Sequence, residues 1–278
     1  MILKIGKILP RILMYIFLFA LLAFSTIPLL QVFVNSFRTN ADVLRRPFGL
    51  PAQWVFNNWR ETWVVGDYGT ALMNSFIIAS VVIVLVLIVV GLAAYAMSKL
   101  EFRGREFFIG YFFVAIALPG FLSMVPIFFL FNNIGLINTR ASLMILYTAW
   151  QIPFNMLLLR TFLGGIPREI EEAAKIDGCS ELQAFIHITV PIAKSIFMTI
   201  AILVFVNVWN EFLLANTFIM SDHLRPASTR FVRFIGEFSR DMARIYTGAA
   251  ITTLPIIVMY LLFSRRFIEG MSSGSVKG

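Results

Sequence analysis

Charged residues are scarce in this chain, and their scarcity excludes an ordinary water-soluble domain. Only 14% of the 278 residues are Asp, Glu, Lys or Arg, whereas 59% are hydrophobic, and the mean hydropathy is +0.84. A soluble domain carries about 25% charged residues. Most side chains must therefore face lipid or other apolar side chains, which indicates a polytopic membrane protein.

Cysteine and histidine are nearly absent as well. A single cysteine, Cys179, excludes an intrachain disulfide bond, and His187 and His223 form no metal-binding motif, so we expect no metal site. The chain also lacks a Walker-type lysine loop, a nucleophile elbow and paired carboxylates at motif spacing. We therefore expect it not to be an enzyme and to bind no cofactor.

Positive charge exceeds negative charge, with a formal net charge of +8. The Lys and Arg residues lie in loops and at the ends of apolar runs rather than on one basic face. This distribution is typical of membrane topology and contact with lipid headgroups, and it argues against a nucleic-acid partner.

Long apolar runs account for most of the chain, and each can cross a hydrocarbon layer, which needs about 20 helical residues. Lipid offers no partners to backbone groups and the alternating pattern of a barrel is missing, so we expect helices. The sequence predicts an all-α protein with six spans: Ile12–Phe37, Tyr68–Ser98, Phe107–Thr139, Ala141–Leu159, Ser195–Ser221 and Ile245–Ser264. Kinks are expected at five prolines: Pro28, Pro119, Pro126, Pro153 and Pro255.

The flanking charges favour one orientation. Lys4, Lys7 and Arg11 precede the first run, which lacks a small-residue cleavage site; this favours a retained span over a cleaved signal peptide. The N-terminus is then expected in the cytoplasm, and six crossings return the C-terminus to the same side. Basic residues after the second and last runs agree with this orientation, whereas five arginines in the third outer loop, residues 221–244, oppose it.

One polar segment, residues 167–191, stands between the fourth and fifth runs; we call it the polar loop. Pro167 suits a first helical turn, followed by Glu169, Glu171 and Glu172 near the positive helix end. Gly178 can end this helix in the left-handed conformation. Two further features follow: Ser180 with Gln183 predicts a capping box for a second helix, and Pro191 reopens the chain. Within each helix one face is predicted by spacing: Ile170 with Ala173 and Ala174, and Leu182 with Phe185 and Ile186. A surface connector without a partner remains an alternative.

The residues of the polar loop carry a family resemblance. Glu172-Ala173-Ala174, Asp177-Gly178 and Val190-Pro191 resemble the EAA loop of permease subunits of binding-protein-dependent ABC importers. Four further stretches resemble the carbohydrate-uptake branch of this family: Asn74-Ser75, Ala94-Tyr95-Ala96, Trp209-Asn210-Glu211-Phe212 and 267–278. The last of these is similar to the C-terminus of the second, six-span permease of maltose-type systems. Departures are Cys179 for Ala, Val190 for Leu and Ser195 for a common Pro.

The resemblance implies a fold, partners and a location. The fold is the type I ABC importer permease fold with cytoplasmic coupling helices, in the cytoplasmic (inner) membrane of a prokaryote. The implied partners are a second homologous permease, two ATPase subunits that bind ATP and Mg, and an extracellular or periplasmic solute-binding protein. Three parts are expected: residues 1–67 with the first span and outer loop, 68–266 as the type-1 transmembrane domain containing the coupling loop 167–191, and a cytoplasmic tail, 267–278, that reaches towards the ATPases.

Site residues follow from the resemblance in the same way. The ATPase is expected to dock on the polar loop through Glu172, Ala173, Ala174, Asp177, Gly178 and Pro191, with Glu172 as acidic anchor. A substrate pathway is expected at Asn74, Asn207, Asn210 and Glu211. Glu211 is the only acid in a span, about 25 Å beyond Lys194; pairing with a loop arginine is its alternative. The third outer loop is expected to contact the binding protein through Arg230, Phe231 and Arg233, with a solvated loop as the alternative.

The resemblance to the carbohydrate-uptake branch implies that the cargo is a sugar or oligosaccharide. The spans hold almost no charge at mid-depth that would neutralise an ion, and this favours an uncharged cargo. A phosphorylated polyol such as a glycerol phosphate is the alternative cargo within the same family. Two other classes remain. A secondary transporter would usually carry ionisable groups at the midplane, and a membrane enzyme would cluster Asp, Glu or His at one face.

Overall fold

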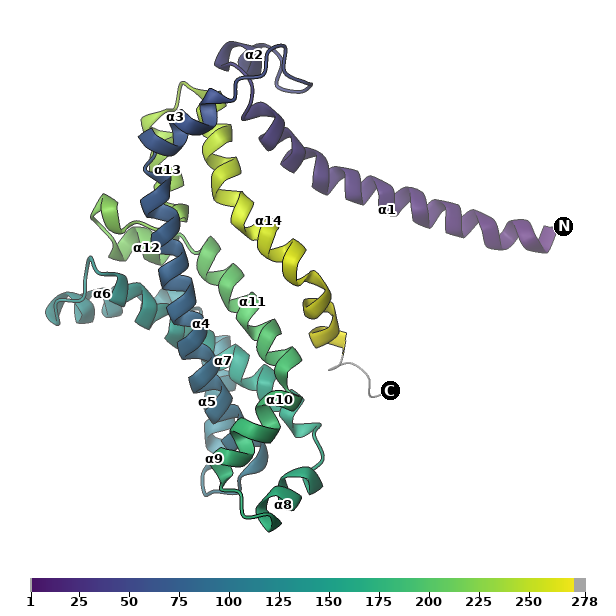
Figure 1. Cartoon of the computed structure of the whole chain (residues 1–278), viewed down its shortest axis with the longest axis vertical. Helices are drawn as coiled ribbons and strands as arrows, with labels where there is room; N and C mark the ends of the chain where they lie inside the picture. The colour runs from purple at the N-terminus through teal and green to yellow at the C-terminus, as the bar shows by residue number, and fades with distance from the viewer. Residues whose placement is uncertain (1, 273–278) are drawn as a thin grey trace. The chain divides into compact units, whose positions relative to one another are not determined.

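The computed structural model describes residues 2–272, and within that range every regular element is helical (Figure 1). The expected all-α class is therefore confirmed. The expected tail extends beyond this range at residues 273–278, whereas α14 continues to Ser272. The α-helices are α1 (Ile2–Asn35), α2 (Asn40–Arg45), α3 (Asn57–Val65), α4 (Tyr68–Lys99), α5 (Arg105–Ala117), α6 (Met124–Asn133), α7 (Arg140–Gly164), α8 (Glu169–Ile176), α9 (Glu181–Ala184), α10 (Val190–Ile192), α11 (Lys194–Asn210), α12 (Leu213–Phe218), α13 (Ala227–Glu237) and α14 (Met242–Ser272).

Within residues 2–272, four helices, α1, α4, α7 and α14, are long and apolar enough to cross a membrane, and the number rises to six if each of two bent pairs counts as one span. The third predicted span is one such pair, because α5 and the helical segment 120–133 meet at 91°. The bend lies at Pro119. Leu118 adopts the extended conformation there, as a residue before proline prefers. Pro28, Pro153 and Pro255, in contrast, lie inside continuous helices.

The fifth predicted span, Ser195–Ser221, is wrong as a continuous helix. Helix α11 ends at Asn210, Glu211 is extended, and the short helix α12 follows. The break has a local cause, because the Glu211 carboxylate accepts hydrogen bonds from the backbone N–H groups of Leu214 and Ala215, at 2.7 and 3.0 Å. A side chain that caps the next helix ends the preceding one.

The expected outer loop 221–244 is also corrected, since most of it is helical. Helix α13 occupies Ala227–Glu237, and a short 3-10 turn precedes it at Asp222–Leu224. Apolar residues at Phe231, Phe234 and Phe238 recur at helical spacing, and this pattern is typical of an amphipathic helix. The five arginines of residues 221–244 gave this stretch the composition of a polar loop, so the helical spacing of its phenylalanines was missed.

The chain divides into two compact units. The first comprises residues 1–69 and 231–254. Its polar contacts centre on the end of α1, where the fully buried Arg38 donates to Asp42 at 2.8 Å and to Asn35 at 2.9 Å. Hydrogen bonds from Arg38 and Arg46 hold the pKa of Asp42 well below its usual range. Along α1 itself, no side chain from residue 10 to residue 34 is buried.

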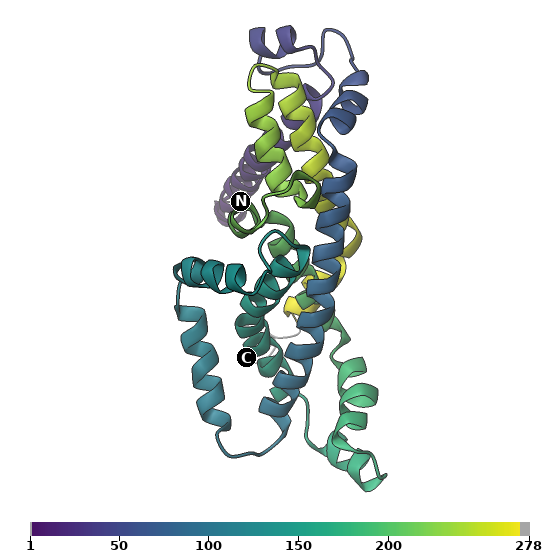
Figure 2. The same ribbon diagram turned by 90° about the vertical axis from the view of Figure 1, so that its left-hand side faces the viewer.

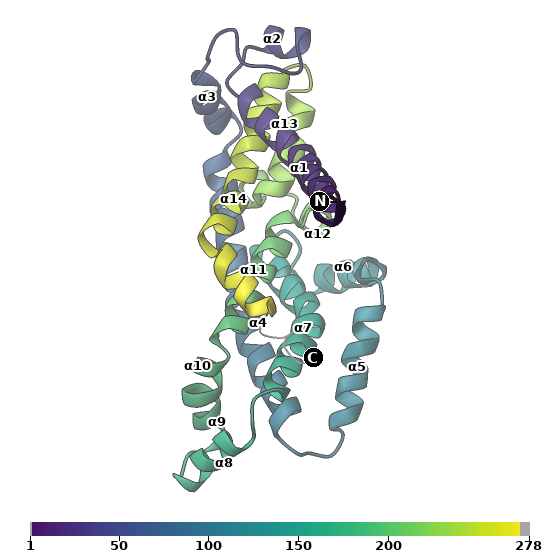
Figure 3. The same ribbon diagram turned by 90° about the vertical axis from the view of Figure 1, so that its right-hand side faces the viewer.

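The second unit comprises residues 70–230 and 255 onward. Helix α7 packs against both α5 and α11 (Figures 2 and 3). Buried side chains of α4, α7 and α11, including Val86, Met156 and Ile200, form one apolar core. The short helices α8 to α10 extend from one end of this core. The unit therefore presents the polar loop on a rigid apolar support.

Candidate functional site

The first helix of the polar loop, α8, ends as its sequence predicts. Gly178 adopts φ +85°, the left-handed region that glycine enters more readily than other residues. The following N–H, from Cys179, reaches back to the carbonyl of Ala174 at 2.9 Å, and the N–H of Gly178 reaches that of Lys175 at 3.0 Å. These bonds satisfy carbonyls at the helix end. The angle between the two short helices is therefore set at Gly178.

The second helix begins as predicted and ends later than predicted. The side chain of Ser180 accepts from the N–H of Gln183, and the Gln183 side chain accepts from the N–H of Ser180, so the capping box is confirmed. Pro191 does not end the helix. In a regular α-helix, the ring of Pro191 would crowd the carbonyl of His187, four residues earlier. This carbonyl lies in a π-helical turn at Phe185–Thr189, and the helical path continues through α10 to Ile192. The chain then turns by 79° into α11.

The inward face of α8 differs from the predicted one. Glu171 and Ala174 are buried, whereas Ile170 and Ala173 are exposed. The apolar face that the spacing predicts, Ile170 with Ala173 and Ala174, is therefore not the side that α8 buries, because Glu171 turns inward to a buried partner. Glu172 is exposed beside the buried Glu171, so the two neighbouring carboxylates have different environments.

Large apolar side chains are exposed on the polar loop. Ile176 is 87% exposed and Leu182 is 57% exposed, and Ile170 and Ile186 are exposed as well. Glu172, Ala173, Asp177, Gly178 and Pro191, which are predicted docking residues, are also exposed, and Ala174 alone of that set is buried. An apolar surface rimmed by acidic groups is typical of a protein-binding site.

Two side chains of α4 attach the polar loop to the core of the second unit. Lys99 Nζ lies 3.2 Å from Glu171 Oε1 and donates to the carbonyl of Ile166 at 2.8 Å. Both side chains of the ion pair are buried, at 2% and 8% exposure. The contact is ionic rather than an aligned hydrogen bond, since Glu171 Oε1 has no hydrogen-bond partner among the described residues.

The second attachment uses a tyrosine one turn earlier. Tyr95 Oη donates to Glu181 Oε2 at 3.1 Å, and Lys175 Nζ lies 2.6 Å from the other oxygen of the same carboxylate. The hydrogen bond to Glu181 raises the pKa of Lys175, which favours its charged form. Around these contacts lies a groove of about 630 Å³, lined mainly by charged side chains. Sequence reasoning missed both Lys99 and Tyr95 as parts of this site.

At a second place in the same unit, a network of hydrogen bonds surrounds the buried Asn74, and we call it the polar knot. Its other members are Ser75, Arg140, His223 and Arg225. Asn74 is fully buried. Its amide donates to the carbonyls of His223 at 2.9 Å and Arg225 at 3.0 Å, and its oxygen accepts from Arg140 at 2.8 Å. Ser75 accepts from the N–H of Ala227 at 2.8 Å. These contacts give Asn74 a structural role, and its predicted place in a substrate pathway stays a prediction.

Glu211 also has defined structural contacts. Besides capping α12, its carboxylate accepts a hydrogen bond of 2.5 Å from the hydroxyl of Tyr147 in α7. Its backbone carbonyl accepts from Ser228 at 2.7 Å. Neither the predicted pathway role nor the alternative pairing with a loop arginine is tested by these contacts, which join α7, α11 and the start of α13.

The other predicted pathway residues lie beside amides that sequence reasoning missed. Asn207 on α11 is exposed and donates to Gln151 Oε1 on α7 at 3.3 Å. Asn155 donates to the same oxygen at 3.2 Å, and its own Oδ1 is buried without a hydrogen-bond partner among the described residues. Asn210 is exposed near the end of α11. Gln151 and Asn155 could have been found from the sequence, because they are carboxamides within an otherwise apolar, charge-free run.

The predicted binding-protein contacts differ in exposure. Arg230 is buried at 9% exposure, Phe231 is half-buried, and Arg233 is exposed within 3.5 Å of Glu237. Of the three, Arg233 alone is exposed.

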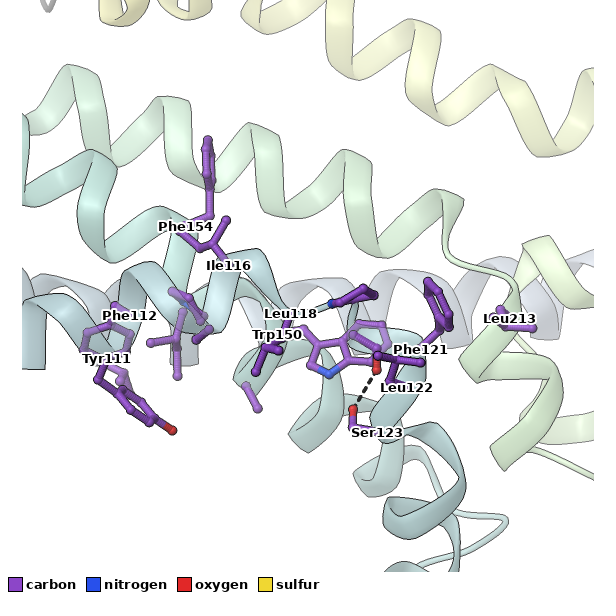
Figure 4. Close-up of a pocket in the computed structure, with 17 residues that line it drawn as sticks. Tyr111, Phe112, Ile116, Leu118, Phe121, Leu122, Ser123, Trp150, Phe154 and Leu213 are labelled. Atoms are coloured by element: carbon purple, nitrogen blue, oxygen red, sulfur yellow. Dashed lines mark hydrogen bonds between the residues drawn. The ribbon is translucent and has the colours of Figure 1, made fainter.

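A cavity larger than this groove beside the polar loop lies elsewhere, between α4, α5 and α7, and has a volume of about 1200 Å³ (Figure 4). Aromatic and aliphatic side chains line it, including Phe112, Phe121 and Trp150. The hydroxyl of Ser123 donates to the carbonyl of Gly120 at 2.6 Å. With so few polar groups, this cavity suits an apolar occupant rather than a sugar.

Comparison with known proteins matches residues 88–271 to the family described as binding-protein-dependent transport system inner membrane component. The chain is 33% identical over 257 residues to the trehalose transport system permease protein SugB of Mycobacterium tuberculosis, which covers 92% of this chain and 93% of that protein. It is 30% identical over 254 residues to the diacetylchitobiose uptake system permease protein NgcG of Streptomyces coelicolor, covering 90% and 84%.

A solved structure shares the fold. It is the crystal structure of a bacterial ABC transporter involved in the import of the acidic polysaccharide alginate, with a TM-score of 0.80 at 23% identity, covering 95% of this chain and 97% of that one. The expected type I ABC importer permease fold is thereby confirmed.

Proposed function

This chain belongs to the family of binding-protein-dependent transport system inner membrane components, and we propose that it is the permease subunit of an ATP-driven importer that carries a sugar or oligosaccharide across the cytoplasmic membrane. The cargoes in the names of its relatives, trehalose and diacetylchitobiose, support this substrate class. Neutral carbohydrate agrees with spans that hold amides rather than charges near mid-depth.

The observation that carries the proposal is the form of the polar loop. A charged, helical element stands out from an apolar core, with Ile176 and Leu182 exposed and Gly178 fixing its turn. Exposed apolar side chains beside carboxylates suit a protein partner better than lipid headgroups, because a lipid-facing helix favours Lys and Arg on its polar side. The partner proposed for this surface is a cytoplasmic ATPase subunit, with Glu172, Asp177 and Gly178 in contact.

The complex proposed around this chain contains a second homologous permease, two ATPase subunits that bind ATP and Mg, and a solute-binding protein on the other side of the membrane. If the bent pair of α5 and residues 120–133 is the third crossing and α11 is the fifth, the polar loop follows the fourth crossing and shares a side with the N-terminus. Both termini are then cytoplasmic, like the ATPases.

The proposed substrate pathway follows the amides of α7 and α11. Exposed carboxamides at membrane depth are unfavourable against lipid, so Asn207 and Asn210 are expected to face a water-filled pathway or the partner permease. Carboxamides both donate and accept, as sugar hydroxyls do, and Asn155 Oδ1 is an unused acceptor. For the binding protein, Arg233 and Phe231 are the proposed contacts, while Arg230 is already buried.

Purification of this chain from its native membrane in a mild detergent, followed by mass spectrometry, tests the assembly. Recovery of a second permease together with an ATPase is the expected result. Recovery of the chain alone, or of copies of itself only, would contradict the importer and favour a secondary transporter.

The cargo needs a separate experiment. The reconstituted complex is loaded with its binding protein, and uptake of a labelled sugar is challenged with neutral disaccharides and with a glycerol phosphate. Competition by neutral sugars is expected. Competition by the phosphorylated polyol alone would replace the proposed cargo and leave the importer assignment intact.

A further inference from the structure

Helix α4 is attached to the polar loop by two side chains on the same face. Tyr95 and Lys99 are four residues apart, so they lie one above the other along the helix. Lys99 reaches Glu171 on α8, and Tyr95 reaches Glu181 on α9. The two halves of the polar loop, on either side of Gly178, are therefore held to one rigid element rather than to each other alone.

Close packing reinforces these attachments. The rings of Tyr95 and Phe185 lie 5.2 Å apart between centroids. At Gly91, one turn earlier, an added Cβ would lie only 3.1 Å from the Phe185 ring. The second half of the polar loop is thus packed against α4 as well as hydrogen-bonded to it, and a displacement of the loop meets resistance from α4 directly.

The other end of α4 belongs to the polar knot. Asn74 and Ser75 hold the carbonyls of His223 and Arg225 and the N–H of Ala227. Between Asn74 and Tyr95 the helix is continuous and free of proline, and it rises about 30 Å at roughly 1.5 Å per residue. One helix therefore joins the polar loop to residues 223–227, which lead into α13, by side-chain contacts at both ends.

We propose that α4 is the rod that transmits motion between the ATPase-facing polar loop and the segment 223–227, and that Tyr95 and Lys99 are the positioning residues that attach it. The proposal rests on the function proposed above, since it assigns the route by which the docked ATPase moves the permease. A bistable coupling needs contacts that keep the two sites in register. Two attachments on one helix face restrain both sliding and rotation of the loop.

The test uses the complete reconstituted complex with its binding protein and measures sugar uptake and ATP hydrolysis on the same vesicles. Tyr95→Phe removes one hydroxyl and keeps the ring that packs against Phe185. Tyr111→Phe removes a hydroxyl from an exposed position on α5 and is the matched control. A second pair of variants is Lys99→Glu, alone and combined with Glu171→Lys, which restores opposite charges at the same place.

The expected result is that Tyr95→Phe complexes assemble and hydrolyse ATP, whereas the sugar transported per ATP falls about tenfold, the order of a hydrogen bond to a charged group. Tyr111→Phe should match the parent protein. Lys99→Glu should lower the same ratio, and Glu171→Lys in combination should restore it at least partly.

Two outcomes would overturn the inference. If the parent complex is active and Tyr95→Phe leaves the sugar transported per ATP unchanged, the proposed role of α4 in transmitting motion is rejected and the importer assignment stands. Equal losses of uptake and hydrolysis in every variant, without rescue by the charge swap, assign Tyr95 and Lys99 to folding only. Absence of ATP-driven uptake in the parent complex would instead reject the proposed function.

Discussion

The polar knot and the polar loop lie in the same compact unit, yet they use polar residues in opposite ways. In the knot, Asn74 is fully buried, and both the nitrogen and the oxygen of its side-chain amide have hydrogen-bond partners. In the loop, most polar and several large apolar side chains are exposed, and two residues of α4 provide the attachments described above. The knot fixes one end of α4, whereas the loop offers a surface at the other.

The difference predicts where mutations act. A buried polar group contributes to stability because its removal leaves partners unsatisfied in a medium without water. An exposed side chain such as Ile176 contributes little to folding of the isolated chain, so a large apolar side chain at this surface position points to binding. Changes in the knot should therefore reduce the amount of folded permease, and changes on the loop surface should alter coupling at constant folding.

The largest effect is expected for Asn74→Ala. The change strands the charged Arg140 and two backbone carbonyls, and we expect a loss of about 4 kcal/mol in unfolding free energy. Thermal unfolding of the purified protein in detergent measures it. Asn210→Ala, which removes an exposed amide that donates to the carbonyl of Val206, is the control and should unfold within a few degrees of the parent. Equal stabilities of the two variants would contradict the structural role of the knot.

A sharper test compares substitutions of two neighbouring carboxylates, the buried Glu171 and the exposed Glu172. Glu171→Gln removes the buried partner of Lys99 and should lower stability by about 3 kcal/mol, since an unpaired buried charge remains. Glu172→Gln changes an exposed residue and should leave thermal unfolding unchanged while weakening recovery of the ATPase. Both variants are measured by unfolding and by co-purification. The reverse assignment, with Glu172 stabilising and Glu171 neutral, would contradict the burial pattern.

Sequence patterns predicted the local parts of the loop. The glycine at 178 and the Ser180–Gln183 pair depend on neighbours within a few residues, so the sequence alone is enough to predict both. The pairing of Lys99 with Glu171 joins residues far apart in the chain, and nothing in the spacing of either indicates it. The buried face of α8 was missed for the same reason, because its partner lies on α4.

The spans show the same limit. Apolar runs predicted α4 and α7 closely, and proline chemistry predicted the bend at Pro119. The end of α11 at Asn210 does not follow from the sequence pattern, in which Glu211 resembles an intramembrane acid, whereas its carboxylate caps α12 and accepts from Tyr147. For Asn74, the resemblance implied a place in a substrate pathway, and only the folded chain brings Arg140 and residues 223–225 to it.

A moderate effect is expected at Gly178, where the loop turns. Gly178→Val places a β-branched residue at φ +85°, which costs about 1–2 kcal/mol in the loop. No neighbouring atom lies within 4 Å of an added Cβ, so the cost is conformational rather than steric. We expect insertion to persist and sugar uptake to fall, as it also should for Gly178→Pro, whereas Gly178→Asn, which tolerates this conformation, should transport. Normal transport by Gly178→Pro would contradict the coupling role.

The smallest effect concerns the helix start that follows. Ser180→Ala removes one half of the capping box and should destabilise α9 by about 1 kcal/mol, because the N–H of Gln183 loses its acceptor. Hydrogen exchange of the amides in residues 181–184 should accelerate about fivefold, while exchange in α8 stays constant. Thr139 caps α7 in the same way, by accepting from the N–H of Ser142. Thr139→Ala is therefore the matched control, and its effect should stay at the start of α7. If Ser180→Ala accelerated exchange in α8 equally, the two helices would respond as one body, and Gly178 would not act as a joint between them.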